Sequence, residues 1–307
     1  MEQLMRNALL YMSKSKTSTK MAKKYGLRFG ASRFVAGESI SSAIDVVRNL
    51  NKQGIVVTLD HLGEFVYSPE EATTAADFCI QTLDAIHHAG VKSGLSVKMT
   101  QLGLDISRDL CMSNMRRILD RAKKYGRFVR IDMEDYAHNE ITIEIFKELV
   151  EEYGPKTIGL VIQAYLYKSD KDLDLMHELG ATLRLVKGAY KEPESVAFPE
   201  KEDVDKNFIH LIEKHLTNGH YTAVATHDEK CIEHVKAFVR KNNIPNSQFE
   251  FQMLYGIRTQ LQQDLAKEGY KVRVYVPYGD DWYGYFMRRL AERPANVGFV
   301  LKSMFKG

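Results

Sequence analysis

Two adjacent arginines near the end of the chain, Arg288 and Arg289, are well suited to binding an acid. A guanidinium pair forms a fork that matches a carboxylate or a phosphate through charge-assisted hydrogen bonds. Glu292 follows Arg288 by four residues, so on a helix it shares one face with that arginine and can orient its guanidinium. An exposed salt bridge has the same spacing, so the rest of the sequence must decide between the two interpretations.

A ring of polar residues is expected where buried strands end. Polar groups buried without partners are costly. A whole ring of them therefore favours a large, mostly polar ligand. Single members have simpler explanations: Lys98 and Asp132 could form a structural ion pair, His227 could cap a helix, and Gly188 and Ala189 could be an ordinary turn. The strand-end residues are Asp60, His61, Lys98, Asp132, Met133, Gln163, Arg184, Lys187, Gly188, Ala189, Thr226, His227, Gln252 and Tyr275.

The segment from Arg184 to Tyr190 combines two cations with small residues, so a phosphate could approach its backbone closely. The sequence contains no HxH, HExxH or cysteine cluster with metal-ligand spacing, and we expect no metal. It also lacks a GxSxG elbow. Catalysis without a metal or a protein nucleophile favours an organic cofactor.

The elements that must position these residues are short apolar runs alternating with amphipathic stretches. Nearly continuous apolar runs are typical of strands buried on both sides in a parallel sheet. The predicted strands are 55–59, 95–99, 128–132, 159–163, 182–186, 222–226, 249–253 and 272–276. The predicted helices between and after them are 69–89, 110–125, 140–153, 169–179, 203–218, 228–242 and 257–268.

Eight strands alternating with helices predict an α/β fold, a (β/α)₈ barrel of TIM type. A doubly wound sheet is the alternative. Such a sheet typically has a glycine-rich GxGxxG turn after an early strand, and none is present. Helical stretches at 2–14 and 19–25 make residues 1–38 a predicted helical extension packed on the barrel. We expect helix 39–50 to close the bottom of the barrel. The aromatic residues and arginines of the final helix, Trp282–Glu292, predict that it covers the mouth.

The composition indicates one globular domain spanning residues 1–307. The chain is 44% hydrophobic with a formal net charge of +3 and no long basic run, so nucleic acid is not an expected partner. Its three cysteines are far apart, which fits a reducing compartment. No apolar run has the length of a signal peptide or a membrane span. We expect a cytoplasmic protein, with peripheral contact at the inner face of the cell membrane left open.

Several motifs, taken in their order and spacing, resemble the proline dehydrogenase family in its compact bacterial monofunctional form. The resemblance covers nearly the whole chain, from Arg33-Phe34-Val35-Ala36-Gly37 to the last helix. After Glu292 the chain has Arg293-Pro294-Ala295-Asn296, where larger family members often have Glu-Asn directly, so contacts beyond Glu292 are in doubt. The remaining motifs are Arg184-Leu185-Val186-Lys187-Gly188-Ala189-Tyr190, Ala225-Thr226-His227-Asp228, Glu250-Phe251-Gln252-Met253-Leu254-Tyr255-Gly256, Tyr275 with Tyr278, and Arg288-Arg289-x-x-Glu292.

The resemblance implies an FAD-dependent enzyme that oxidises L-proline to Δ1-pyrroline-5-carboxylate, the first step of proline degradation to glutamate. It implies hydride transfer from substrate C5 to flavin N5 and a membrane quinone as electron acceptor.

The resemblance also implies a role for each matching position. Arg288 and Arg289 would hold the substrate carboxylate, Glu292 would orient them, and Lys98 would add positive charge. Tyr275 would pack over the proline ring, with Tyr278 as a further substrate contact, and Asp132 would lie in the hydrogen-bond network beneath the substrate. Arg184 would sit beside flavin N5. The other expected cofactor contacts are Met133 and Gln163 at the flavin ring, Lys187, Gly188 and Ala189 along the phosphate and ribityl path, and Thr226, His227 and Gln252 around the rest of the dinucleotide.

Three alternatives remain open at this point. Another flavin barrel of the methylenetetrahydrofolate reductase type would need a platform for a pterin. A cofactor-free lyase or aldolase could use Lys98 or Lys187 as a Schiff-base amine. A ligand-binding barrel without turnover would keep the fold alone.

Overall fold

The computed structural model describes residues 31–63 and 66–292, and for residue 31 and residues 288–292 it describes the backbone alone. The predicted helices at 2–14 and 19–25 lie outside these residues. Within them, no helix is long and apolar enough to cross a membrane.

Eight parallel strands form a closed barrel in which each strand pairs with its neighbours in sequence and β8 pairs with β1. This confirms the predicted barrel, and each observed strand overlaps a predicted one. β2 and β4 are buried along their whole length, and in β4 this explains an apolar run that is unbroken up to Gln163. The strands are β1 Val56–His61, β2 Ser93–Val97, β3 Val129–Ile131, β4 Ile158–Gln163, β5 Thr182–Val186, β6 Thr222–Ala225, β7 Phe249–Leu254 and β8 Val272–Tyr278.

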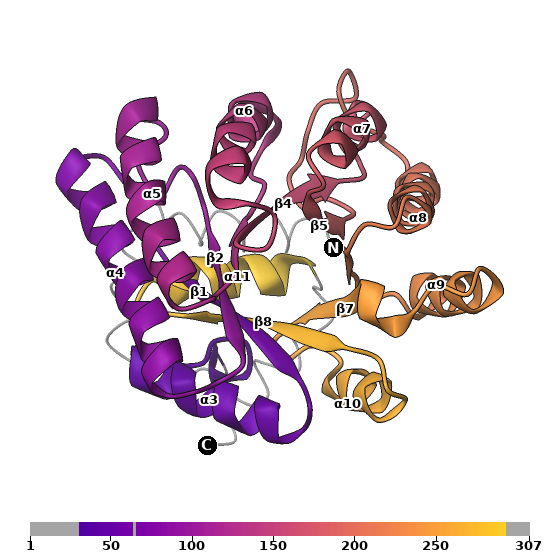
Figure 1. Ribbon diagram of the computed structural model, residues 1–307, viewed down its shortest axis with the longest axis horizontal. Helices are drawn as coiled ribbons and strands as arrows, with labels where there is room; N and C mark the ends of the chain where they lie inside the picture. Colours follow the sequence, from indigo (N-terminus) through magenta and orange to yellow (C-terminus); the bar gives the residue numbers. More distant parts are fainter. Residues whose placement is uncertain (1–30, 64–65, 293–307) are drawn as a thin grey trace.

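Helices alternate with the strands and form a ring around them (Figure 1). Several begin at a residue whose side chain accepts a first-turn N–H, as Ser68 and Ser107 do. The helices are α3 Ile40–Lys52, α4 Pro69–His88, α5 Arg108–Lys124, α6 Tyr136–Tyr153, α7 Ser169–Glu178, α8 Lys201–Thr217, α9 Glu229–Lys241, α10 Thr259–Lys267 and α11 Trp282–Glu292, with short 3-10 turns at Ala31–Arg33 and Asn246–Gln248.

The position of α3 differs from the prediction that it would close the bottom of the barrel. Its apolar face, which includes Ala43, Ile44 and Val47, is buried, and the helix contacts β1, β8 and α4. In Figure 1 it lies in the outer ring between α4 and α10. The helix therefore seals the outer wall at the seam where β8 meets β1, because its buried stripe matches the side of the barrel.

The last helix, α11, lies across the barrel in Figure 1 and not in the outer ring. It follows β8 directly, so it begins at the carboxyl end of the strands. Trp282 anchors its first turn: the indole is buried and its Nε1 donates to Glu38 at 3.0 Å. Phe286 packs against Phe34 at a ring distance of 6.2 Å. These contacts position the last helix over the barrel mouth, as predicted.

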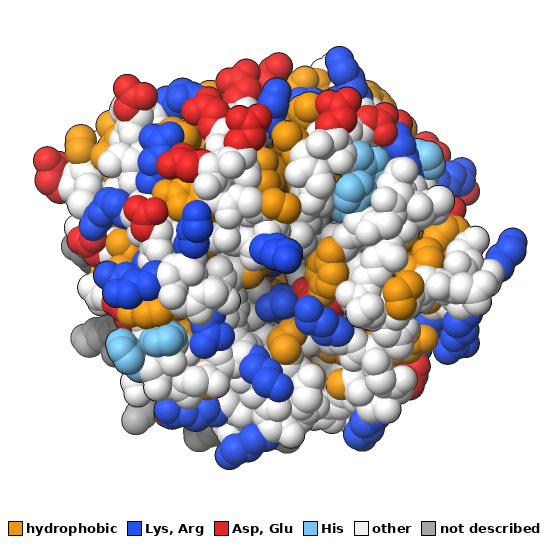
Figure 2. All heavy atoms as spheres, in the orientation of Figure 1, with side chains coloured by type: hydrophobic (Ala, Val, Ile, Leu, Met, Phe, Trp, Pro, Cys, Tyr) orange, Lys and Arg blue, Asp and Glu red, His pale blue; other side chains and the backbone are white. Residues whose placement is uncertain are grey.

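Acidic and basic residues of several helices lie at opposite ends of the barrel. Helices run antiparallel to the strands, so their first turns lie near the mouth and their last turns near the opposite end. Acidic residues occupy first turns, as in α4 and α8, and basic residues occupy last turns, as in α5 and α9. Figure 2 shows Lys and Arg side chains gathered around a central hollow on one face of the molecule. This arrangement complements the helix dipoles.

Candidate active site

Asp132 lies at the centre of a group of charged side chains at the carboxyl ends of the strands. Its Oδ1 accepts from Nη1 of Arg184 at 2.6 Å, and its Oδ2 accepts from the hydroxyl of Tyr275 at 2.7 Å. Arg184 belongs to β5 and Tyr275 to β8, while Asp132 directly follows β3. The barrel thus brings together three residues that are far apart in sequence. We call these three, with Lys98 and Asp60, the mouth cluster.

Lys98 joins the mouth cluster mainly through Asp60. Its Nζ lies 3.1 Å from both carboxylate oxygens of Asp60 and 3.7 Å from Oδ2 of Asp132. Burial alone would lower the pKa of Lys98, but the charges of Asp60 and Asp132 outweigh it and raise that pKa above its ordinary value. The ammonium of Lys98 is thus held protonated beside two carboxylates. It does not suit a Schiff-base amine, which must lose its proton, so this geometry counts against the lyase alternative at Lys98.

Tyr275 is held as a protonated hydrogen-bond donor. Burial and the neighbouring Asp132 raise the pKa of its hydroxyl well above the ordinary value. The guanidinium carbon of Arg184 lies 5.3 Å from the centre of its ring, within cation–π range. The ring and hydroxyl of Tyr275 therefore both contact other members of the mouth cluster.

Arg184 is anchored at each of its three nitrogens. Besides Asp132, it donates from Nε to Oε1 of Gln252 at 2.6 Å and from Nη2 to Oγ of Ser96 at 3.2 Å. It is buried within the barrel. Three anchors fix both the position and the plane of the guanidinium, as a cation aimed at a bound cofactor requires.

Gln163 provides an observation that fits a flavin ring. The side chain is buried at the end of β4, and its Nε2 donates to the carbonyl of Glu134 at 2.9 Å. Its Oε1 has no hydrogen-bond partner among the described residues. A buried acceptor without a donor is costly, and a ring N–H of a cofactor would satisfy it. Met133, also buried, follows Asp132 on the same side of the mouth.

Lys187 and Gly188 are the residues predicted to line a phosphate path, and their contacts within the protein are as follows. Nζ of Lys187 is already 2.6 Å from Asp205 and 3.1 Å from Asp228, so two carboxylates balance its charge. Gly188 has a φ of +112°, and a Cβ there would lie 2.5 Å from the ring of Tyr165. The glycine is thus required by its conformation and by Tyr165. Ala189 follows it in an exposed position.

Thr226 and His227 are tied to the ends of β6 and β7. The hydroxyl of Thr226 accepts from the backbone N–H of Asp228 at 3.1 Å, and Nε2 of His227 accepts from the N–H of Leu254 at 2.9 Å. Asp228, and not His227, caps α9. Gln252 is buried beneath the mouth as a partner of Arg184. A dinucleotide contact by Thr226 or His227 stays a prediction.

Tyr278 lies apart from the mouth cluster. Its buried hydroxyl is hydrogen-bonded to Oγ1 of Thr82 on α4, in the layer between barrel and helices. A substrate contact by Tyr278 therefore has no support in this geometry. The side chains of Arg288, Arg289 and Glu292 lie outside the described residues, so their predicted fork remains a prediction.

Two site residues were missed as functional candidates. Asp60 was noted at a strand end but received no role, although it is 1% exposed and is the nearest carboxylate to Lys98. Glu134 accepts from the N–H of Thr100 at 3.1 Å and from its hydroxyl at 2.5 Å. Burial raises the pKa of Glu134. The sequence contained a signal for both acids, since each ends or follows an apolar strand and such positions face the barrel mouth.

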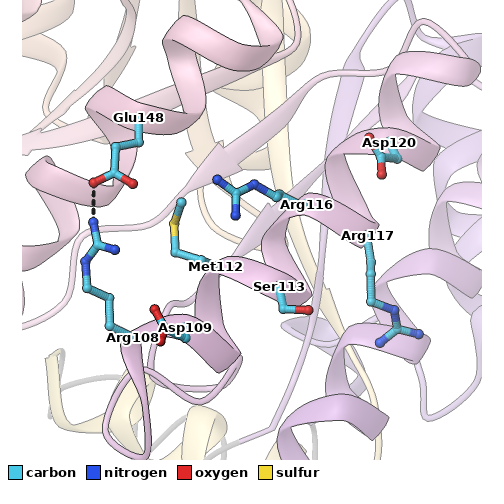
Figure 3. Close-up of a pocket in the computed structure, with 8 residues that line it drawn as sticks. All are labelled: Arg108, Asp109, Met112, Ser113, Arg116, Arg117, Asp120 and Glu148. Atoms are coloured by element: carbon cyan, nitrogen blue, oxygen red, sulfur yellow. Dashed lines mark hydrogen bonds and ion pairs between the residues drawn. The ribbon is translucent and has the colours of Figure 1, made fainter.

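A surface pocket of about 430 Å³ lies elsewhere, on the outer wall along α5 (Figure 3). Arg108 of α5 points at Glu148 of α6 and is paired with it, and Arg116 pairs with Glu152 at 2.9 Å. Arg108 and Arg116 of this pocket are thus already paired with carboxylates. No strand-end residue lines the pocket. No group of acidic, histidine or cysteine residues in the described ranges could hold a metal ion. The mouth is therefore the candidate active site.

Comparison with known proteins gives one consistent result. The family model described as proline dehydrogenase matches residues 43–302. Proline dehydrogenase 1 of Bacillus subtilis is 51% identical over 303 residues, covering 99% of this chain and 100% of that protein. Proline dehydrogenase of Deinococcus radiodurans is 48% identical over 309 residues, covering 100% of this chain and 99% of that protein.

The fold has a close match among solved structures. Proline utilization A (PutA) of Bdellovibrio bacteriovorus, solved after inactivation by N-propargylglycine, superposes with a TM-score of 0.81 at 28% identity. The alignment covers 89% of this chain and 34% of the PutA chain. This chain therefore corresponds to about a third of the length of that protein.

Proposed function

Because this chain belongs to the proline dehydrogenase family, we propose that it oxidises L-proline at the barrel mouth with FAD as the bound cofactor. The chain is a proline dehydrogenase, an oxidoreductase of the first step of proline catabolism. The proposal adds the cofactor, the hydride transfer, the acceptor and the roles of individual residues.

The mouth cluster is the observation that supports the proposal most strongly. Proline is a small zwitterion, so an enzyme must recognise its carboxylate and its ring. Lys98 supplies a fixed positive charge and Tyr275 an aromatic ring, and both face the same space as Asp132. Both oxygens of Asp132 are occupied by Arg184 and Tyr275, so it acts by orienting these two side chains. Holding C5 of proline in reactive geometry is the main contribution that such a site can make.

The FAD proposal rests on the unpartnered acceptor of Gln163 and on the three-point anchoring of Arg184. When bound, FAD would supply the hydride acceptor at N5 and deliver the electrons to a quinone. Met133 and Gln163 would contact the ring, with Arg184 at its N5 side. Lys187, Gly188 and Ala189 would line the phosphate and ribityl path, and Lys187 would have to exchange a carboxylate partner for the phosphate. Thr226, His227 and Gln252 would hold the remainder.

Arg288 and Arg289 on α11 would bind the substrate carboxylate, with Glu292 orienting them. The position of α11 across the mouth supports this assignment. In Arg288→Ala and Arg289→Ala variants, the dissociation constant of a carboxylate proline analogue should rise by at least about tenfold, because one charge-assisted pair is lost. Unchanged binding in both variants would remove the arginines from the substrate site.

The acceptor is proposed to be a membrane quinone. We also propose that the protein is cytoplasmic and meets this quinone by peripheral contact at the inner face of the cell membrane. We further propose that residues 1–307 form one domain, with residues 1–38 as an extension packed on the barrel.

The proposal is tested by product analysis. The purified protein is supplied with FAD, L-proline and a soluble quinone, and Δ1-pyrroline-5-carboxylate and reduced quinone are measured. Equal amounts of both products are expected, with D-proline as the matched control substrate. Product formation by the protein after its flavin has been removed would contradict the cofactor. Quinone left oxidised while product accumulates would contradict the acceptor.

A further inference from the structure

The interior of the barrel contains a carboxylate that the proposed mechanism does not use. Glu250 of β7 is 1% exposed and lies one layer below the mouth cluster. TIM barrel interiors are ordinarily filled by branched apolar side chains, so a charge here requires a physical reason. Arg273 donates to it from Nε at 2.5 Å and from Nη2 at 3.1 Å, and Tyr221 donates at 2.7 Å.

These partners keep Glu250 ionised. Burial alone would raise the pKa of its carboxyl group, but Arg273, Lys271 and Tyr221 outweigh burial and lower that pKa. An ionised carboxylate can only accept hydrogen bonds. Whatever polar group faces Glu250 from the mouth side must therefore present a donor.

The group that faces it is the amide of Gln252. Nε2 of Gln252 donates to Oε1 of Glu250 at 2.5 Å, which leaves Oε1 of Gln252 to accept from Nε of Arg184 at 2.6 Å. The reversed amide would set oxygen against carboxylate and NH₂ against guanidinium, so both contacts would become repulsive. The negative charge of Glu250 thus fixes the direction of the amide, and the amide fixes the guanidinium.

We propose that Glu250 is a positioning residue for Arg184, acting through Gln252. We call Glu250, Gln252 and Arg184 the Glu250 relay. The inference rests on the proposed function, because it assumes that Arg184 serves the cofactor. The competing explanation is that Glu250 and Arg273 only fill and balance the barrel interior.

A double-mutant cycle on the holoenzyme separates the two explanations. The variants are Glu250→Gln, Gln252→Leu and the two combined. A neutral glutamine at position 250 can turn either face toward Gln252 and no longer fixes its direction. The readouts are the dissociation constant of FAD from the apoprotein, the midpoint potential of the bound flavin, and the rate of flavin reduction by proline, measured per bound flavin.

The Glu250 relay predicts that Glu250→Gln slows flavin reduction by about tenfold and weakens FAD binding by a similar factor. In the Gln252→Leu background the same change should have no further effect, since the path to Arg184 is already broken. Equal effects of Glu250→Gln in both backgrounds would overturn the proposal in favour of a purely structural role.

Further variants serve as controls for misfolding, for nonspecific effects and for the role of Arg184. If Glu250→Gln does not fold, Glu250→Gln combined with Arg273→Gln removes one charge of each sign and enters the same cycle. The matched control is Asp172→Asn. Asp172 is a buried acid of α7 that pairs with Lys168, and its replacement should leave the flavin properties unchanged. Arg184→Lys tests the premise: unchanged potential and FAD affinity in that variant would refute the assigned role of Arg184 itself, whatever the cycle shows.

Discussion

Tyr275 of β8 donates its hydroxyl hydrogen to Asp132 across the barrel mouth at 2.7 Å, while its ring lies beside the guanidinium of Arg184. One aromatic side chain thus contacts both charges of the shortest ion pair in the mouth cluster. Tyr275→Phe keeps the ring and removes only the hydroxyl contact. Because a hydrogen bond to a charged group is lost, kcat/KM for proline should fall by about tenfold or more.

Tyr153→Phe is the matched control for this variant. The hydroxyl of Tyr153 donates to Asp120 at 2.9 Å, in the same kind of pair but on the outer helices. Its kcat/KM should equal that of the unchanged protein. A Tyr275→Phe enzyme with unaltered kcat/KM would remove the hydroxyl from the mechanism.

Lys98→Met should destabilise the protein by about 3 kcal/mol, because it leaves the buried carboxylate of Asp60 without its ammonium partner. The free energy of unfolding is measured by urea denaturation. Adding Asp60→Asn should restore part of the loss, since the stranded charge is removed. Lys206→Met, at an exposed pair with Glu202, should leave stability nearly unchanged. Equal losses in Lys98→Met and Lys206→Met would contradict the ion-pair assignment.

The pH dependence of kcat/KM should be set by the substrate. The proline nitrogen must be neutral for hydride to leave, so the rate should rise with pH as that nitrogen loses its proton. Lys98 and Tyr275 both have raised pKa values, so both remain protonated over this range. The profile should not fall again below about pH 10, the ordinary pKa of both side-chain types. A bell-shaped profile with an alkaline limb near pH 8 would show that an enzyme group titrates instead.

A histidine group at the far end of the barrel should make stability depend on pH. His177, His215 and His220 stack on one another, with Nε2 of His177 2.9 Å from Nδ1 of His215. Burial, reinforced by His177 and His220, lowers the pKa of His215 to about 3. The unfolded chain binds this proton below about pH 6.5, so the stabilisation is present above that pH and is lost as the pH falls toward 3.

His215→Phe keeps an aromatic ring and removes the titration. Between pH 6.5 and 5 the free energy of unfolding should fall by about 2 kcal/mol less in this variant than in the unchanged protein. Asp170, Asp174 and Lys214 also face the histidines and should retain their own contributions. Leu211→Ala on the same helix should lower stability equally at both pH values. An unchanged pH dependence in His215→Phe would show that His215 is protonated in the folded state.

The barrel could be predicted from sequence because most strand residues are buried and the strands therefore form nearly continuous apolar runs. Most of the mouth cluster could be predicted for a related reason: Lys98 and Asp132 directly follow strands, and Tyr275 lies within the last strand. Their pairing could not be predicted, because it depends on which strands face one another across a closed barrel. Asp60, and not Asp132, is the closer partner of Lys98 for this reason.

The placement of Tyr278 could have been predicted from strand geometry. Side chains alternate between the two faces of a strand, and Tyr278 lies three residues after Tyr275, so the two must point to opposite sides. Tyr275 faces the barrel interior and Tyr278 faces α4. The charged interior at Glu250 and Arg273 was harder to predict from the sequence, since a buried charge interrupts an apolar pattern without indicating its partner.

The measurement that tests the proposed function most directly is the visible spectrum of the purified protein before and after L-proline is added without oxygen. We predict a flavin spectrum that loses its visible absorbance when proline is added and keeps it when D-proline is added. A flavin that stays oxidised would contradict proline as the hydride donor. A colourless protein that does not bind added FAD would contradict the assignment of the mouth as a flavin site.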